Sequence, residues 1–103
     1  MIEIRASRVH FYSQVDEDNF ISWLEKIESI VSMRGEGEDI VLCFEKSTIT
    51  DDDLLELIAI HSRYKISKGH LKVFLSNENI LWFKDRKMYW YNDVFCLTTD
   101  LID

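Results

Sequence analysis

Three consecutive aspartates, Asp51, Asp52 and Asp53, stand directly before a leucine-rich run, and no other stretch of the sequence raises a sharper chemical question. Adjacent carboxylates repel one another, so three in a row need a reason. Four uses fit such a run: a site for a hard cation such as Mg²⁺, a phosphorelay site, the start of a helix, and an attraction for a positively charged partner. The surrounding sequence favours the last two.

The metal and phosphorelay readings lack their further ligands. Receiver-type phosphorelay domains place an aspartate at the end of a central strand and a lysine later in the chain. Here Glu45 stands where that aspartate would be, at the end of the run "IVLCFE". The D-x-D-x-D-G calcium pattern is also absent from the sequence. No metal ligands are therefore assigned.

No pattern of catalytic residues stands out along the chain. His10, His61 and His70 are scattered without ligand spacing, so each is expected at the surface or at the boundary of the core. The G-x-S-x-G, P-loop and G-x-G-x-x-G patterns are absent. Glu45 beside Lys46 is interpreted as a charge pair at a strand end. We therefore expect neither an enzyme nor a bound cofactor.

Aromatic residues gather near the C-terminus, where six of the thirteen fall between positions 82 and 95. A strand is expected here, and a strand exposes one of its two faces, so either Trp90 is buried and Tyr89 and Tyr91 face outward, or the reverse. Exposed Tyr and Trp side chains are typical interface anchors. The alternatives are cover by a short helix, a homodimer seam, or stacking of single-stranded nucleic acid, which the overall acidity disfavours.

Length and composition describe one domain spanning residues 1–103, with 47% hydrophobic and 30% charged residues as in ordinary soluble proteins. The N-terminus lacks the apolar segment of a signal peptide, and the longest apolar runs are too short to span a bilayer. We therefore expect a cytoplasmic protein. Cys43 and Cys96 lie in apolar contexts without C-x-x-C spacing and are expected to be buried, reduced thiols.

Charge is distributed unevenly along the chain. The net charge of −7 argues against nucleic acid and anionic membranes as partners. Residues 14–56 carry 13 acidic and 3 basic side chains, whereas residues 57–91 carry 2 acidic and 7 basic ones. The chain therefore has an acidic first half followed by a basic stretch.

Hydrophobic periodicity predicts strands alternating with helices. Strands are expected over residues 1–13 (one kinked strand or two short ones), 39–47, 70–76 and 88–98, and helices over residues 16–35, 51–69 and 77–87. Asp16 or Asp18 can cap the first helix, and Thr50 with Asp53 fits a capping box at the second. This order predicts an α/β domain with a mixed sheet of about four to five strands and crossover helices.

This topology also predicts where the acidic residues meet. Helices that follow parallel strands begin at the same edge of the sheet. Seven carboxylates would then share one rim: Asp16, Glu17, Asp18, Asp51, Asp52, Asp53 and Glu78. Acid at a helix start contributes roughly 0.3–1 kcal/mol to stability, but one or two residues suffice for that. The rim is therefore interpreted either as helix capping or as a surface for a basic protein.

Residues 47–80, "STITDDDLLELIAIHSRYKISKGHLKVFLSNENI", resemble the STAS domain of anti-sigma factor antagonists in the order strand, acidic turn, helix, glycine, strand. The resemblance implies a STAS-like fold and a regulatory partner such as an anti-sigma kinase. Asp51 matches the aspartate of the family motif, and Asp52 stands where the family has its phosphorylated serine. A permanent carboxylate there could mimic the charge of a phosphoserine.

By type, the chain also resembles immunity proteins of toxin–immunity systems, including those of contact-dependent growth inhibition. The residues that carry this resemblance are the acidic runs 16–18 and 51–53 and the aromatic segment 88–95. It implies a non-catalytic inhibitor that covers the active site of a basic toxin, such as a nuclease. The expected partner-binding residues are Asp16, Glu17, Asp18, Asp51, Asp52, Asp53, Tyr89, Trp90 and Tyr91.

Overall fold

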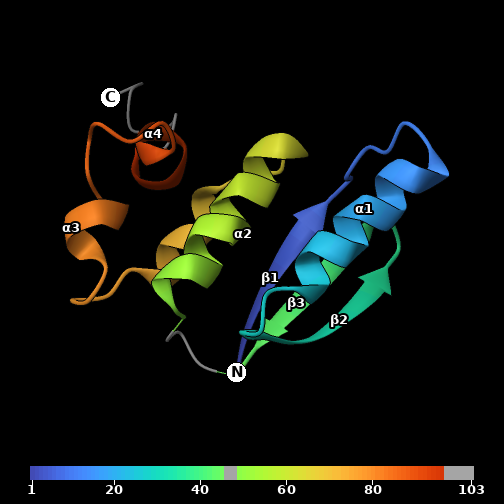
Figure 1. Cartoon of the computed structure of the whole chain (residues 1–103), viewed down its shortest axis with the longest axis horizontal. Coiled ribbons are helices and arrows are strands. Elements are labelled where there is room, and N and C mark those ends of the chain that lie inside the picture. The colour runs from blue at the N-terminus through green and yellow to red at the C-terminus, as the bar shows by residue number, and fades with distance from the viewer. Residues whose placement is uncertain (46–48, 97–103) are drawn as a thin grey trace.

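A computed structural model of the protein describes residues 1–45 and 49–96. Lys46, expected to pair with Glu45, lies outside the described residues, as does the end of the predicted strand 88–98. The elements in chain order are β1 (Ile2–Ser7), α1 (Gln14–Glu25), β2 (Ile30–Glu36), β3 (Asp39–Phe44), α2 (Asp51–Arg63), the 3₁₀ helix η1 (Gly69–Phe74), α3 (Ile80–Phe83) and α4 (Tyr91–Phe95) (Figure 1). The α/β class is confirmed.

The sheet is antiparallel, with the strand order β1-β3-β2. Ile4 of β1 and Met33 of β2 both lie opposite Leu42 of β3, so β3 is the central strand and β1 runs parallel to β2. The continuous apolar run of β3 agrees with its burial on both faces, since Val41, Leu42, Cys43 and Phe44 are each at most 3% exposed. Glu36 and Asp39 face each other across a two-residue hairpin, where Gly37 adopts a φ of 61°.

The first helix is shorter than predicted. It ends at Glu25, and residues expected to continue it to position 35 form strand β2 instead. Ile30 and Met33 pack against the core from β2, which also satisfies the hydrogen bonds of one edge of β3. A tertiary pairing thus overrides an apolar spacing that also suits a helix.

Two predicted strands are also helical. Residues 70–76 lie mostly in η1, and residues 91–95 of the predicted strand 88–98 form α4. The buried positions explain the difference: Leu71 and Phe74 are three residues apart, and Trp90 and Val94 are four apart. The described residues therefore contain three strands rather than four to five, and they form no parallel crossover sheet.

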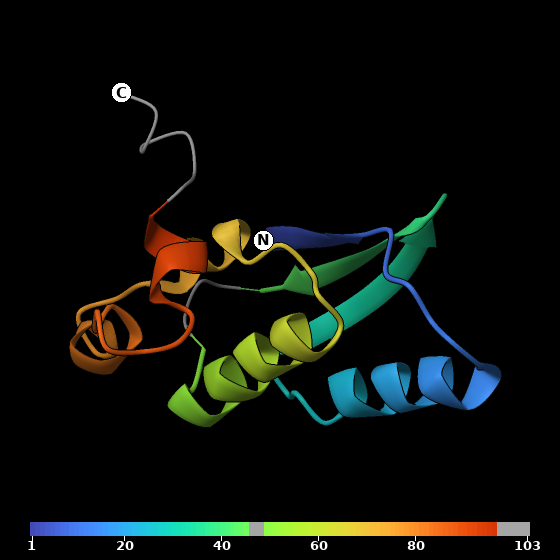
Figure 2. The same cartoon turned by 90° about the horizontal axis from the view of Figure 1, so that it is seen from above.

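The core lies between the sheet and the helices. Figure 2 shows α1 and α2 on the same side of the sheet, where Phe20, Leu24, Leu54 and Leu57 are fully buried. Burial of each such side chain contributes about 1.5–3 kcal/mol. α3 and α4 lie on the side of α2 away from α1, and η1 lies behind α2 in this view (Figure 1).

Charged side chains cover the opposite face of the sheet. Arg34 contacts Glu3 (3.1 Å) and Glu36 (2.7 Å), and Arg5 contacts Glu36 (2.9 Å) and Asp39 (3.2 Å). These ion pairs lower the pKa of Glu3 and Glu36, chiefly through hydrogen bonds from Arg34.

None of the helices described has the length and apolar character needed to cross a membrane.

Candidate functional site

The two acidic runs lie at opposite ends of the α1–α2 pair, so the prediction of one shared rim is wrong. β1 and β3 are antiparallel, and the helices that follow them therefore begin at opposite edges of the sheet. Figures 1 and 2 show α1 and α2 running in opposite directions. The carboxylate of Asp53 accepts hydrogen bonds from the Ser29 amide (3.0 Å) and hydroxyl (2.6 Å), which ties the start of α2 to the end of α1.

Within the run at the start of α2, the three aspartates have different roles. The side chain of Thr50 accepts a hydrogen bond from the Asp53 amide (3.1 Å), which confirms the predicted cap. Asp53 is partly buried against Ser29 and serves the fold, whereas Asp51 and Asp52 are exposed. Only these two are free to contact a partner.

The run at the start of α1 is divided in the same way. Ser13, not Asp16 or Asp18, caps α1, and its hydroxyl accepts from the Asp16 amide at 3.1 Å. Asp16 is half-buried, and its carboxylate accepts a hydrogen bond from the Tyr12 amide at 2.9 Å. Glu17 and Asp18 are exposed. Stabilisation of the start of α1 therefore explains Asp16 without a partner.

The fold creates an acidic surface that the sequence did not reveal. The loop after α1 and the start of α2 meet at the Ser29–Asp53 contact, and the segments that lead to and from it carry exposed acids. Trp23 of α1 adds a second tie, because its Nε1 donates to Glu56 at 2.8 Å. We call this surface the acidic end; it consists of Glu25, Glu28, Asp51, Asp52 and Glu56. Its residues lie too far apart in the sequence to be recognised as one cluster.

The aromatic segment has one ring that a partner can reach directly. Trp90 is 4% exposed, and its Nε1 donates to the Phe83 carbonyl at 2.7 Å. Tyr89 is 64% exposed, and Tyr91 is half-buried against Phe95. Trp90 is therefore buried and Tyr89 faces outward, as one alternative stated, but Tyr91 is half-buried and the segment is helical rather than a strand. Trp90 therefore holds the core together, and Tyr89 presents its ring to solvent.

Tyr89 lies beside the face of α2 that carries the acidic end. Its hydroxyl accepts a hydrogen bond from Ser62 at 3.3 Å. A hollow of about 440 Å³ is lined by Trp23, Tyr89, Lys65 and the α2 residues Ala59, Ser62 and Arg63. Because Glu56, Ala59 and Arg63 share one face of α2, this hollow continues from the acidic end.

His61 is buried, contrary to its prediction, and it pairs with the partly buried His70. His61 is 1% exposed, and its Nε2 lies 2.8 Å from Nε2 of His70. Nδ1 of His61 donates to the Leu57 carbonyl at 2.8 Å, which assigns its Nε2 as the acceptor and His70 as the donor. Burial, assisted by the neighbouring His70, lowers the pKa of His61 to about 4, and burial also lowers that of His70. Both rings are therefore neutral at pH 7.

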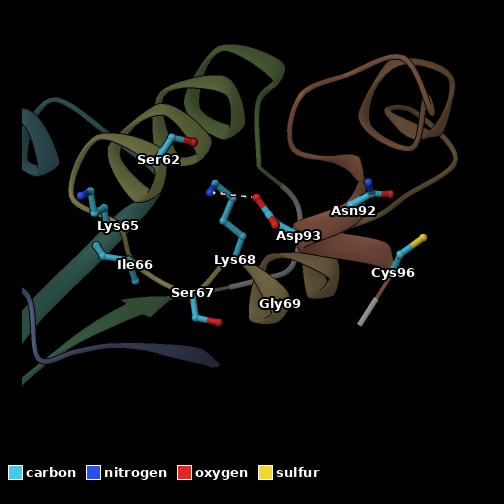
Figure 3. Close-up of a pocket in the computed structure, with 9 residues that line it drawn as sticks. All are labelled: Ser62, Lys65, Ile66, Ser67, Lys68, Gly69, Asn92, Asp93 and Cys96. Atoms are coloured by element: carbon cyan, nitrogen blue, oxygen red, sulfur yellow. Dashed lines mark hydrogen bonds and ion pairs between the residues drawn. The ribbon is translucent and has the colours of Figure 1, made fainter. Parts of the chain in front are cut away.

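Another hollow lies where the end of α2 meets η1 and α4 (Figure 3). It has a volume of about 500 Å³, and Lys68 lies in its wall with its ammonium 3.3 Å from the Asp93 carboxylate. Figure 3 shows the sulfur of Cys96 turned away from this pair. Because Asp93 neutralises Lys68, the pair connects η1 to α4 and leaves little charge for a ligand.

The cysteines and acids provide no evident metal ligands. Cys43 and Cys96 are both free thiols, the first buried and the second partly buried. Across residues 1–45 and 49–96, no three His, Cys, Asp or Glu side chains converge to hold a metal ion.

Comparison with known proteins gives no match at the level of a family model, a curated protein or a solved structure.

Proposed function

We propose that this protein is a non-catalytic inhibitor of a basic protein, and specifically an immunity protein that covers the active site of a nuclease toxin. The observation that carries the proposal is the acidic end. The end of α1, the loop after it and the start of α2 present five exposed carboxylates there, and the cation Lys26 directly follows α1. A nuclease has a cationic cleft that accommodates phosphates, and a surface of this kind can occupy it.

In this proposal the carboxylates speed association with the partner, and aromatic side chains slow its dissociation. Exposed carboxylates contribute little individually, but together they steer a basic partner and raise its association rate. Dissociation is limited by buried anchors, for which Tyr and Trp are the preferred residues. Tyr89 fits that role, with Trp23 in the adjoining hollow. We assign Trp90 to the core and Tyr91 to the margin of this surface.

Local helix stability does not account for the whole acidic end. Asp51 and Asp52 stabilise the N-terminus of α2, but Glu25 lies in the last turn of α1, where the helix dipole disfavours a negative charge. α1 has no basic residue in its last turn. A carboxylate at a helix end where it costs stability supports a role for Glu25 outside the helix itself.

The alternative proposal is a STAS-like regulatory module that binds an anti-sigma kinase or a similar protein. The exposed carboxylate of Asp52 in the first turn of α2 supports it, because this is the position that the resemblance assigns to the phosphorylated serine. The 3₁₀ helix at Gly69–Phe74 counts against it, since the resemblance implies a strand there.

The test compares two variants with the same change in net charge. Asp51→Lys/Asp52→Lys alters the acidic end, and Glu17→Lys/Asp18→Lys alters exposed acids at the opposite end of the helix pair. Native protein and both variants would be used to capture partners from the source bacterium, and the captured protein identified by mass spectrometry. The purified partner would then be assayed for nuclease activity with each form added.

We expect the first variant to lose both capture and inhibition, with the second close to native, and native affinity to fall as salt is raised. Equal inhibition by both variants would contradict the acidic end as the binding surface. Capture of a kinase whose binding is insensitive to salt would favour the STAS-like alternative instead.

A further inference from the structure

At the end of the helix pair opposite the acidic end, the structure holds a second site of reversed charge. A pocket of about 320 Å³ is lined by Arg8, His10, Tyr12, Arg63, Tyr64 and Lys65, with Asp16 in its wall. We call it the basic pocket. We propose that it binds a small phosphorylated molecule that carries a planar ring, such as a mononucleotide. The proposal does not require the immunity function, although Arg63 and Lys65 also line the hollow beside Tyr89.

The cations of the basic pocket are available to an anion. Within residues 1–45 and 49–96, Arg63 and Lys65 make no ion pair. Arg8 pairs only loosely with Glu38, at 3.9 Å, with both side chains at least 80% exposed. Three such cations in a chain of net charge −7 are a local reversal of sign. Two guanidinium groups and an ammonium are the donors that proteins use for phosphate.

The carboxylate of Asp16 does not neutralise these cations. One of its oxygens accepts from the Tyr12 amide at 2.9 Å. The Tyr64 hydroxyl donates to the backbone carbonyl of the same residue at 3.5 Å, so Asp16 joins the two aromatic walls. It is not paired with Arg8, Arg63 or Lys65 in the part of the chain described. The pocket thus keeps an excess of positive charge.

Two of the three cations occupy backbone positions that disfavour them. Arg8 has a φ of 55° and Lys65 a φ of 57°, and no other residue described except Gly37 has a positive φ. Lys65 follows the last turn of α2, where the Ile66 amide donates to the His61 carbonyl at 2.8 Å. Glycine is the usual residue at this position of such a helix end. Both strained positions line the same pocket and carry a cation, which is the pattern of a functional site.

The aromatic walls provide a surface for a flat ring. His10 and Tyr12 meet edge to face, with ring centroids 4.6 Å apart, and Tyr12 is 85% exposed. Tyr64 is held from behind by Phe11 and Phe20. A base can stack on the free ring of Tyr12 while its phosphate lies among the cations. The volume lies within the range of small-ligand pockets.

The experiment titrates the full chain with AMP, ribose 5-phosphate, adenosine and inorganic phosphate, and follows binding by calorimetry and by amide shifts in NMR. AMP should bind most tightly, and loss of either the base or the phosphate should weaken binding by about tenfold or more. The shifted amides should be those around Arg8, Tyr12 and Lys65.

Three variants locate the site. Arg63→Gln and Lys65→Asn should each weaken AMP binding several-fold, and asparagine tolerates the left-handed backbone, so the second change keeps the fold. Lys26→Asn, which removes an exposed cation at the acidic end, should leave the affinity unchanged. The proposal is overturned if AMP does not bind at millimolar concentration, if phosphate alone binds as well as AMP, or if all three variants bind AMP like the native chain.

Discussion

The two ends of the α1–α2 pair use opposite charges, and they relate differently to the fold that carries them. At the acidic end, Asp53 joins the helices through Ser29, and exposed acids surround that buried tie. At the basic pocket, Tyr64 joins α2 to α1 through ring contacts with Phe20 and Phe11, and cations surround the rings. In both places a structural contact brings charges of two separate segments together. The two sites differ in their effect on folding stability. Lys65 adopts a disfavoured backbone conformation, whereas Asp51 and Asp52 stabilise a helix end.

The largest effect should come from breaking the tie at the acidic end. Asp53→Ala leaves the Ser29 amide and hydroxyl without their acceptor. Because hydrogen bonds to a charged group contribute about 1.5–3 kcal/mol, we expect a loss of about 2–3 kcal/mol in the free energy of unfolding. Urea denaturation measures it. Asp52→Ala, which alters an exposed neighbour, should change stability by less than about 0.5 kcal/mol, and similar losses in both variants would contradict the role assigned to Asp53.

A second prediction concerns pH and the far half of α2. His61 is buried neutral, with a pKa of about 4 in the folded chain against 6.5 when unfolded. The unfolded chain therefore binds more protons below pH 6.5, and stability falls as pH falls toward 4. Linkage gives a loss of about 2 kcal/mol between pH 7 and pH 5. This window lies above the range in which Glu3 and Glu36, with lowered pKa values, are protonated.

Unfolding by urea at several pH values measures this loss. His61→Gln removes the group with the pKa of about 4 and should make the dependence between pH 7 and pH 5 shallower, while the lowered pKa of His70 still contributes in the same direction. His10→Gln, at an exposed position, should retain the native dependence. A native slope in the His61 variant would show that another group is responsible.

The smallest effect sharpens the comparison because stability and binding should move in opposite directions. Lys65→Gly relieves the left-handed conformation at the end of α2 and should stabilise the protein by about 1 kcal/mol. The same change removes a cation from the basic pocket, so AMP binding should weaken. Lys72→Gly, inside η1, should instead destabilise the protein and leave AMP binding unchanged. If Lys65→Gly does not stabilise the protein, the strain assigned to Lys65 is contradicted.

Part of the candidate site could be predicted because its signals are local. Thr50 as the cap of α2 follows from a hydroxyl placed three residues before an acid. The division between a buried Trp90 and an exposed Tyr89 was part of one of two stated alternatives. The basic stretch after residue 57 was visible as composition, but the aromatic partners of Arg63 and Lys65 were not, because His10 and Tyr12 lie more than fifty residues away.

The sequence alone determined the α/β class, the central apolar strand β3, the start of α2 and the uneven distribution of charge, since each depends on composition or on residues a few positions apart. Only the tertiary structure decided which charges meet. Pairing β1 and β2 with β3 set the strand directions, and those directions placed the acidic runs 16–18 and 51–53 at opposite ends. Strand direction depends on contacts between distant segments, and a local pattern of residues carries no information about it.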